Sequence, residues 1–140
     1  MKEEYEKGPV RAIIVGAGHR AFAYANYALT NPDKLKIVGV ADPNKWRRDL
    51  AVKTFGFSPE RCYENAEQLA TVPVFADAVI NGTMDAEHVP TSLPLLRAGY
   101  DILLEKPFAV NEDEMRELAD TAEKYNRKVM ICHVLRYAPF

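Results

Sequence analysis

Three small residues, Gly16, Gly18 and Ala21, stand at a spacing that suits the binding of a diphosphate. They follow an apolar run rich in β-branched residues and open an Ala-rich segment with helical periodicity. In the G-x-G-x-x-G/A pattern the first glycine permits a tight turn, the second lets a pyrophosphate approach the backbone, and the third small residue lets helix and strand pack closely. The helix also offers free N–H groups and the positive end of its dipole to an anion. We therefore predict a dinucleotide-binding loop and count His19 and Arg20 among its cofactor-binding residues.

An acidic residue, Asp42, follows a second apolar run, 21 residues after Ala21. A carboxylate about 20 residues beyond the third small residue accepts hydrogen bonds from the adenosine ribose hydroxyls. Because it also repels a 2′-phosphate, the cofactor is expected to be NAD rather than NADP. Arg47 and Arg48 keep NADP open, since either could pair with such a phosphate. The alternative is that Asp42 only caps a helix that has Pro43 at its first position.

A second group of reactive side chains, Glu105 and Lys106, comes at the end of another apolar run and is followed by Pro107. A lysine held beside a carboxylate at a strand end can share proton transfer if its surroundings lower its pKa. The alternative is a solvated surface lysine. The sequence therefore offers Lys106 as a catalytic candidate.

The elements that must position these residues alternate between short apolar runs and segments of helical periodicity. This alternation predicts an α/β fold: one doubly wound parallel sheet, the Rossmann fold, with strand order 3-2-1-4-5-6. Ligands of such sheets bind beyond the carboxyl ends of the strands, where the glycine loop, Asp42, Gly82–Thr83 and Glu105–Lys106 all fall. Strands are expected at 10–15, 35–41, 61–63, 76–81, 101–105 and 128–133.

The helices are expected at 18–29, at 43–55 before Gly56, from Asn65, and from Asn111 to Tyr125, the last two with capping-box starts. The helix that ends at Gly99 is ambiguous, because an interior proline costs about 3 kcal/mol or more. Either Thr91 caps a short helix with Pro94 in its first turn, or the segment that contains Pro90 and Pro94 bends.

The composition describes an ordinary water-soluble domain. The 140 residues are 48% hydrophobic and 27% charged, with a net charge of −2, so no basic excess indicates a nucleic-acid partner. The apolar runs are too short to span a bilayer, and the start of the chain does not resemble a secretory signal. Two cysteines seventy positions apart, without a C-x-x-C motif, predict neither a disulfide framework nor a metal site, and Cys132 is expected to be buried. The expected compartment is the cytoplasm.

The motifs GAGHRA, VADP, INGTMDAEH, LLEKP and HVLRYAPF, in this order, resemble those of the Gfo/Idh/MocA oxidoreductase family. The resemblance covers nearly the whole chain from Val10. It implies that Lys106 lies beside the nicotinamide and the substrate hydroxyl, that Glu105 approaches the nicotinamide ribose, and that Thr83 lies near the cofactor. It also implies a cis Lys106–Pro107 peptide bond. His88 matches a histidine of the family and is interpreted here as structural.

The resemblance further implies hydride transfer between nicotinamide and a sugar or polyol hydroxyl. In the family an aspartate and a histidine of a following substrate domain complete the site, and His133 does not match that histidine. We expect a short tail at 1–9 and one NAD(P)-binding domain at 10–140, with the substrate domain absent. The chain, which ends soon after the sixth strand, is then either the cofactor domain of a longer enzyme, which we favour, or a naturally short binding module. Such a chain alone should bind the cofactor with little or no turnover.

Two other functions remain open from the sequence: a non-catalytic dinucleotide-binding or redox-sensing module, and a Rossmann-like binder of a sulfonium cofactor. Glu105–Lys106–Pro107 has no evident purpose in the sulfonium-cofactor binder. We also expect self-association, because loss of a substrate domain would expose apolar surface of the last strand and of 137–140.

Overall fold

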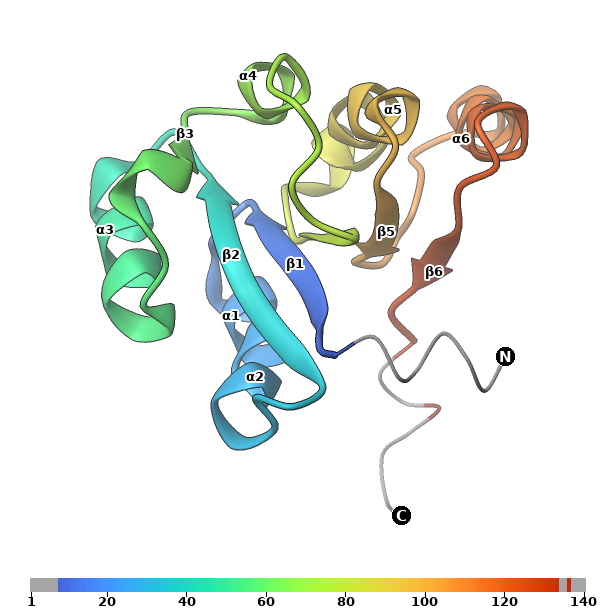
Figure 1. The fold of residues 1–140 in the computed structure, drawn as a ribbon. Helices are drawn as coiled ribbons and strands as arrows, with labels where there is room; N and C mark the ends of the chain where they lie inside the picture. Colours follow the sequence, from blue (N-terminus) through green and yellow to red (C-terminus); the bar gives the residue numbers. More distant parts are fainter. Residues whose placement is uncertain (1–7, 134–135, 137–140) are drawn as a thin grey trace.

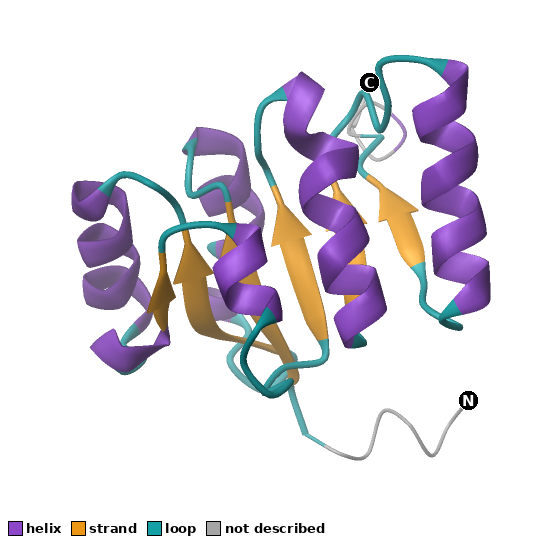
Figure 2. Ribbon diagram, turned by 90° about the horizontal axis from the view of Figure 1, so that it is seen from above, coloured by secondary structure: helices purple, strands orange, loops and turns teal. Residues whose placement is uncertain are grey.

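The computed structural model describes residues 8–133 and residue 136, and it contains one six-stranded parallel sheet (Figures 1 and 2). The spatial order of the strands is β3-β2-β1-β4-β5-β6, which confirms the predicted order 3-2-1-4-5-6. The expectations for 1–7 and 137–140 lie outside the described residues. The strands are β1 Val10–Val15, β2 Leu35–Ala41, β3 Cys62–Tyr63, β4 Ala78–Asn81, β5 Asp101–Leu104 and β6 Val129–Ile131.

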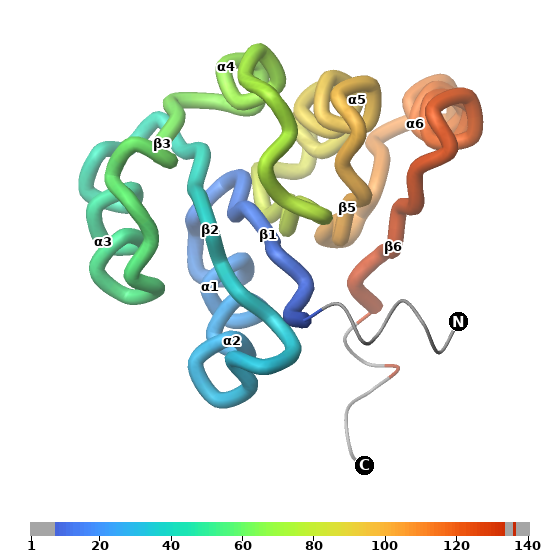
Figure 3. Tube along the Cα trace, in the orientation of Figure 1, coloured from blue at the N-terminus to red at the C-terminus, as the bar shows by residue number. Residues whose placement is uncertain are grey.

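Helices cover both faces of this sheet. In Figure 3, α4, α5 and α6 lie in a row over one face, whereas α1 and α2 lie below the other. The helices are α1 His19–Ala25, α2 Tyr27–Thr30, α3 Lys45–Phe55, α4 Ala66–Ala70, α5 His88–Ala98 and α6 Glu112–Lys124, with short 3-10 turns η1 at Pro59–Arg61 and η2 at Asp85–Glu87.

The alternation of side chains along β1 divides the core into two parts. Ile13 and Val15 belong to the cluster shared with α4, α5 and α6, whereas Ala12 and Ile14 belong to the cluster shared with α1, α2 and α3. Successive side chains of a strand point to opposite faces, and a parallel sheet buries both of them. This is why the central strand reads as a continuous apolar run.

Several helix boundaries differ from the predicted ones. The helix expected at 18–29 is divided at Asn26 into α1 and α2, and a hydrogen bond from Leu29 N–H to Asn26 O tightens the chain there. The third helix begins at Lys45 rather than Pro43, because the side chain of Asn44 accepts hydrogen bonds from Trp46 N and Arg47 N. Asp42 is therefore not the N-cap of α3, and its interpretation as a helix cap was wrong.

The helix α5 begins at His88, so Thr91 lies within the helix and is not its cap. Pro90 occupies the first turn, where an N–H has no intrahelical acceptor. Pro94 lies inside the helix. Tertiary packing compensates for its local cost, since Leu93, Leu95 and Leu96 on either side are buried in the core. As predicted, Gly56 and Gly99 end their helices in the left-handed conformation.

Within the described residues, no helix is both long and apolar enough to cross a membrane.

Candidate functional site

A pocket of about 750 Å³ lies at the carboxyl edge of the sheet, toward which the strand arrows of Figure 2 point. It opens where β1, β2 and β4 end, and where α4 and α5 approach them. Four of the predicted site residues line it: Gly16, Gly18, Asp42 and Thr83. The remaining predicted residues lie outside its lining: His19, Arg20, Ala21, Glu105 and Lys106.

The two glycines of the first loop are required for different reasons. Gly16 has a φ of 77°, and a Cβ there would stand 2.7 Å from the backbone nitrogen of Thr83. Gly18 has an extended backbone with a φ of −82°, and a Cβ there would meet nothing within 4 Å. Gly16 thus lets two chain segments approach each other, whereas the open space at Gly18 faces the pocket and is available to a ligand.

The third small residue, Ala21, is fully buried, and a Cβ on Gly82 would come within 2.9 Å of its methyl group. This close packing of α1 on the loop after β4 confirms the structural reason for a small residue. The first intrahelical hydrogen bond runs from Phe22 N–H to Gly18 O. The backbone amides of His19 and Arg20 precede it, and both of these side chains are exposed at the start of α1.

Asp42 is buried at the end of β2 with its carboxylate beside the glycine loop. Its Oδ2 accepts the Ala17 amide at 2.8 Å, and its Oδ1 accepts the Asn44 amide at 2.8 Å. A carboxylate has about four lone-pair sites, so Asp42 retains capacity for hydroxyl donors in the pocket. The contact with Ala17 was missed from the sequence, because nothing in the pattern predicts that the acid also holds the loop.

The two arginines after Asp42 point in different directions. Nη1 of Arg47 lies 3.8 Å from Oδ2 of Asp42, and Arg47 lines the pocket. Nη1 of Arg48 instead donates to the backbone oxygens of Asp42, at 2.7 Å, and Pro43, at 3.1 Å. Arg47 therefore lies beside the Asp42 carboxylate on the pocket wall, whereas Arg48 braces the start of α3.

A buried amide, Asn81, organises the end of β4. Its Oδ1 accepts the hydroxyl of Thr83 at 2.8 Å, and its Nδ2 donates to the hydroxyls of Thr91 and Ser92, both at 2.9 Å. This role was missed from the sequence, although a polar residue at the end of an apolar strand was the available signal. Asn81 fixes the Thr83 side chain against α5, with Thr83 and Thr91 both on the pocket wall.

The Glu105–Lys106–Pro107 segment follows β5, and its two charged side chains differ in burial. Glu105 is buried, and its Oε2 accepts the hydroxyl of Tyr24 at 2.7 Å. Lys106 is exposed, and its peptide bond to Pro107 is cis, as the resemblance implied. Tyr24 is a second functional candidate that was missed, because only the tertiary structure brings α1 to the end of β5.

Two thiols lie near the sheet, and neither is activated. Cys132 is buried, as expected; burial and the charge of Glu105 raise the pKa of its thiol. Burial also raises the pKa of the Cys62 thiol, although the cation of Arg48 opposes the shift. Because a raised pKa lowers the thiolate fraction, these cysteines are poor nucleophiles.

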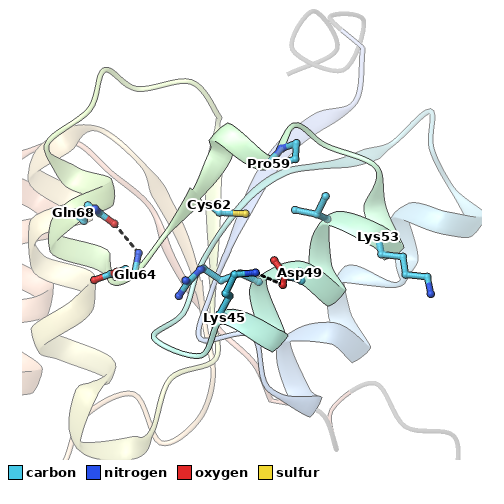
Figure 4. A pocket seen from close by; sticks show the side chains of 9 residues that line it. Lys45, Asp49, Lys53, Pro59, Cys62, Glu64 and Gln68 are labelled. Carbon is cyan, nitrogen blue, oxygen red and sulfur yellow. Dashed lines mark hydrogen bonds and ion pairs between the residues drawn. The ribbon is translucent and has the colours of Figure 1, made fainter.

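A second pocket, of about 480 Å³, lies between α3 and the segment that includes Cys62 (Figure 4). An ion pair of 2.7 Å between Lys45 and Asp49 crosses its wall, and the side chain of Gln68 accepts the Glu64 amide at 2.7 Å. Of its two lysines, Lys45 is thus already paired with a carboxylate. In the described part of the chain, no three His, Cys, Asp or Glu side chains gather as a metal site.

Comparison with protein families gives one match that spans nearly the whole chain. A family model described as an oxidoreductase family with an NAD-binding Rossmann fold, Gfo/Idh/MocA, matches residues 10–133. The chain is also 30% identical over 127 residues to glucose-6-phosphate 3-dehydrogenase of Bacillus subtilis (strain 168). That alignment covers 91% of this chain and 34% of the relative, so the chain spans about a third of the relative's length.

Solved structures share the fold. The WlbA dehydrogenase from Bordetella pertussis, in complex with NADH and UDP-GlcNAcA, has a TM-score of 0.83 at 18% identity, over 92% of this chain and 38% of that one. A 3-ketoreductase from Actinomadura kijaniata, in complex with TDP-benzene and NADP, has a TM-score of 0.80 at 22% identity, over 94% and 39%. Both forms of the dinucleotide thus occur among proteins of this fold.

Proposed function

This chain belongs to the Gfo/Idh/MocA family of oxidoreductases, and we propose that it binds NAD in the pocket at the carboxyl edge of its sheet. The pyrophosphate lies against the loop of Gly16 and Gly18, and the adenosine ribose lies against Asp42. The nicotinamide end extends toward Thr83, with Glu105 and Lys106 beyond it. His19 and Arg20, exposed at the start of α1, lie beside the phosphates.

The observation that carries this proposal is the combination of open space at Gly18 with a buried carboxylate, Asp42, on the same pocket. A Cβ on Gly18 would meet no atom within 4 Å, so a ligand can come as close as the backbone permits. Asp42 is held there by two backbone amides and keeps acceptor capacity. A diphosphate and a ribose diol are both parts of an adenosine diphosphate group.

NAD rather than NADP is the cofactor we propose, because a 2′-phosphate would stand against the Asp42 carboxylate. Arg47 reduces this preference, since its guanidinium already lies 3.8 Å from Asp42 and could turn to a phosphate. The expected result is tighter binding of NAD than of NADP, with NADP still bound measurably.

The substrate class we propose is a sugar or polyol with an oxidisable hydroxyl. The name of the relative at 30% identity, glucose-6-phosphate 3-dehydrogenase, supports this class. The nicotinamide, when bound, supplies the hydride acceptor. Lys106 shares the transfer of the hydroxyl proton, and Glu105 holds the nicotinamide ribose. The chain spans about a third of that relative's length, so the 140 residues alone should bind cofactor without measurable turnover of any polyol.

A titration followed through the single tryptophan tests cofactor binding. Trp46 is exposed on α3, next to pocket residues Asn44 and Arg47, and its emission should be quenched by bound NADH. The matched variant is Gly18→Val, because the extended backbone accepts valine and a Cβ there meets no atom within 4 Å. The variant should melt like the wild type and lose NADH binding. Equal NADH binding by both proteins, or preference for S-adenosylmethionine, contradicts the proposal.

We also propose that the chain associates with itself through the edge strand β6. This strand ends the sheet, and its Met130 is 58% exposed. Among the described residues no strand pairs with the outer edge of β6, and an unpaired strand edge is a template for pairing with another copy. Light scattering should show dimers or larger species that Met130→Lys reduces, whereas a clean monomer at high concentration contradicts self-association.

The compartment we propose is the cytoplasm. Cys62 and Cys132 are both free thiols, which agrees with a reducing environment. Fractionation of cells that express the chain without a tag at either terminus tests this.

A further inference from the structure

His88, the first residue of α5, is completely buried at 0% exposure. Its ring lies between two loops that the proposed function places at the nicotinamide end. Nδ1 lies 2.5 Å from the backbone oxygen of Pro107, and Nε2 lies 2.8 Å from the backbone oxygen of Thr83. The imidazole therefore bridges the loop after β4 and the loop after β5.

Both partners of this ring are carbonyl oxygens, which only accept hydrogen bonds. A neutral imidazole carries one N–H and one lone pair, so it could donate to only one of them. Its other nitrogen would turn a lone pair against a carbonyl lone pair at hydrogen-bonding distance. Two donors are available only when the ring is doubly protonated.

We propose that His88 is held as an imidazolium whose two N–H groups clamp the Thr83 and Pro107 carbonyls, and so set the separation of Thr83 from Lys106. Burial of a cation is costly, and two charge-assisted hydrogen bonds offset that cost. His88 touches neither substrate nor cofactor. It is a positioning residue, and its importance for binding rests on the proposed function.

The backbone of His88 is fixed independently of the ring. Its carbonyl oxygen accepts the Ser92 hydroxyl at 2.6 Å and the Asn81 side-chain amide at 3.4 Å. Both donors belong to the network that also fixes Thr83. The ring thus extends from an anchored backbone toward Pro107, and it has little freedom to release either carbonyl while α5 stays folded.

Nitrogen-15 NMR of the imidazole side chains reads the protonation state directly, without cofactor. The chain has three histidines, and the other two, His19 and His133, are exposed. We expect His88 to show two protonated ring nitrogens at neutral pH, and one protonated with one bare nitrogen at His88 overturns the clamp.

Two variants divide the clamp into its halves. The amide nitrogen of His88→Asn can replace Nδ1, and that of His88→Gln can replace Nε2, so each variant can keep only one of the two bonds. Each should weaken NAD binding about tenfold, the loss expected for one charge-assisted hydrogen bond. The control is Val89→Ala, which removes buried atoms beside His88 but neither bond, and which should keep wild-type affinity.

The outcomes separate the clamp from the proposed function. Wild-type NAD affinity in both His88 variants overturns the positioning role, as does an equal loss in Val89→Ala. If the wild-type chain binds no NAD at all, the proposed function fails, and the nitrogen-15 spectrum still decides the protonation of His88. The nitrogen-15 spectrum also decides the protonation of His88 if neither variant folds, since it needs only the unaltered chain.

Discussion

The hydroxyl of Tyr24 donates a 2.7 Å hydrogen bond to Oε2 of Glu105, and so joins α1 to the end of β5. These elements carry the two halves of the proposed cofactor site: the glycine loop opens α1, and Lys106 follows Glu105. Burial of the phenol and its bond to Glu105 raise the pKa of Tyr24, so the hydroxyl remains a donor throughout the neutral range. The hydrogen bond gives the buried Glu105 carboxylate a donor, which it would lose if the Tyr24 hydroxyl were removed.

Replacement of Tyr24 by phenylalanine should therefore destabilise the fold by about 1–3 kcal/mol, the cost of an unsatisfied buried polar group. Urea denaturation measures it. Tyr27→Phe makes the same chemical change on an exposed side chain of α2 and should stay within about 0.5 kcal/mol of the wild type. Equal stabilities for the two variants would show that the Tyr24–Glu105 bond contributes nothing.

The glycines of the first loop should differ in how they affect stability. Gly16→Ala puts a Cβ against the Thr83 backbone at a positive φ and should cost about 1–3 kcal/mol. Gly18→Ala adds a methyl group in open space and should change the free energy of unfolding by less than about 0.5 kcal/mol. Thermal melts of both variants decide this, and a loss of stability in Gly18→Ala as large as that in Gly16→Ala contradicts it.

The charge of Asp42 should govern the choice between the two dinucleotides. Asp42→Asn removes the negative charge and keeps one oxygen for the Ala17 amide, so NADP binding should strengthen relative to NAD by about tenfold. Arg47→Ala should shift the ratio in the opposite direction, because it removes the pocket-lining cation that lies 3.8 Å from the Asp42 carboxylate. Calorimetric titration of each variant with both cofactors measures the ratios, and an unchanged ratio in Asp42→Asn would falsify the electrostatic explanation.

Stability should decline in alkaline solution. Burial raises the pKa of Cys132 above its ordinary 9.0, and that of Tyr24 above its ordinary 10.0. A group whose folded pKa is raised stabilises the fold below its unfolded pKa, and this contribution disappears as the pH rises toward the folded pKa. The melting temperature should therefore fall from about pH 9 upward, and the fall should be smaller in Tyr24→Phe, measured relative to its own melting temperature at pH 7.

Much of the fold follows from local patterns. The apolar run of β1 serves both faces of the sheet, and Gly56 and Gly99 end helices because only glycine takes a positive φ at low cost. The prolines of α5 made the prediction of that helix ambiguous. Pro94 destabilises the helix locally, whereas the burial of the neighbouring leucines, a long-range effect, stabilises it.

The sheet order and the meeting of Gly16, Gly18, Asp42 and Thr83 at one edge could be predicted from sequence patterns, because the carboxyl ends of parallel strands meet there. The contacts between segments far apart in the chain could not be predicted in this way. The bond from Tyr24 to Glu105 and the two carbonyls around His88 depend on how α1 and α5 pack on the sheet. A spacing pattern records only the positions of residues along the chain. It carries no information about which way the packed helices α1 and α5 direct these side chains.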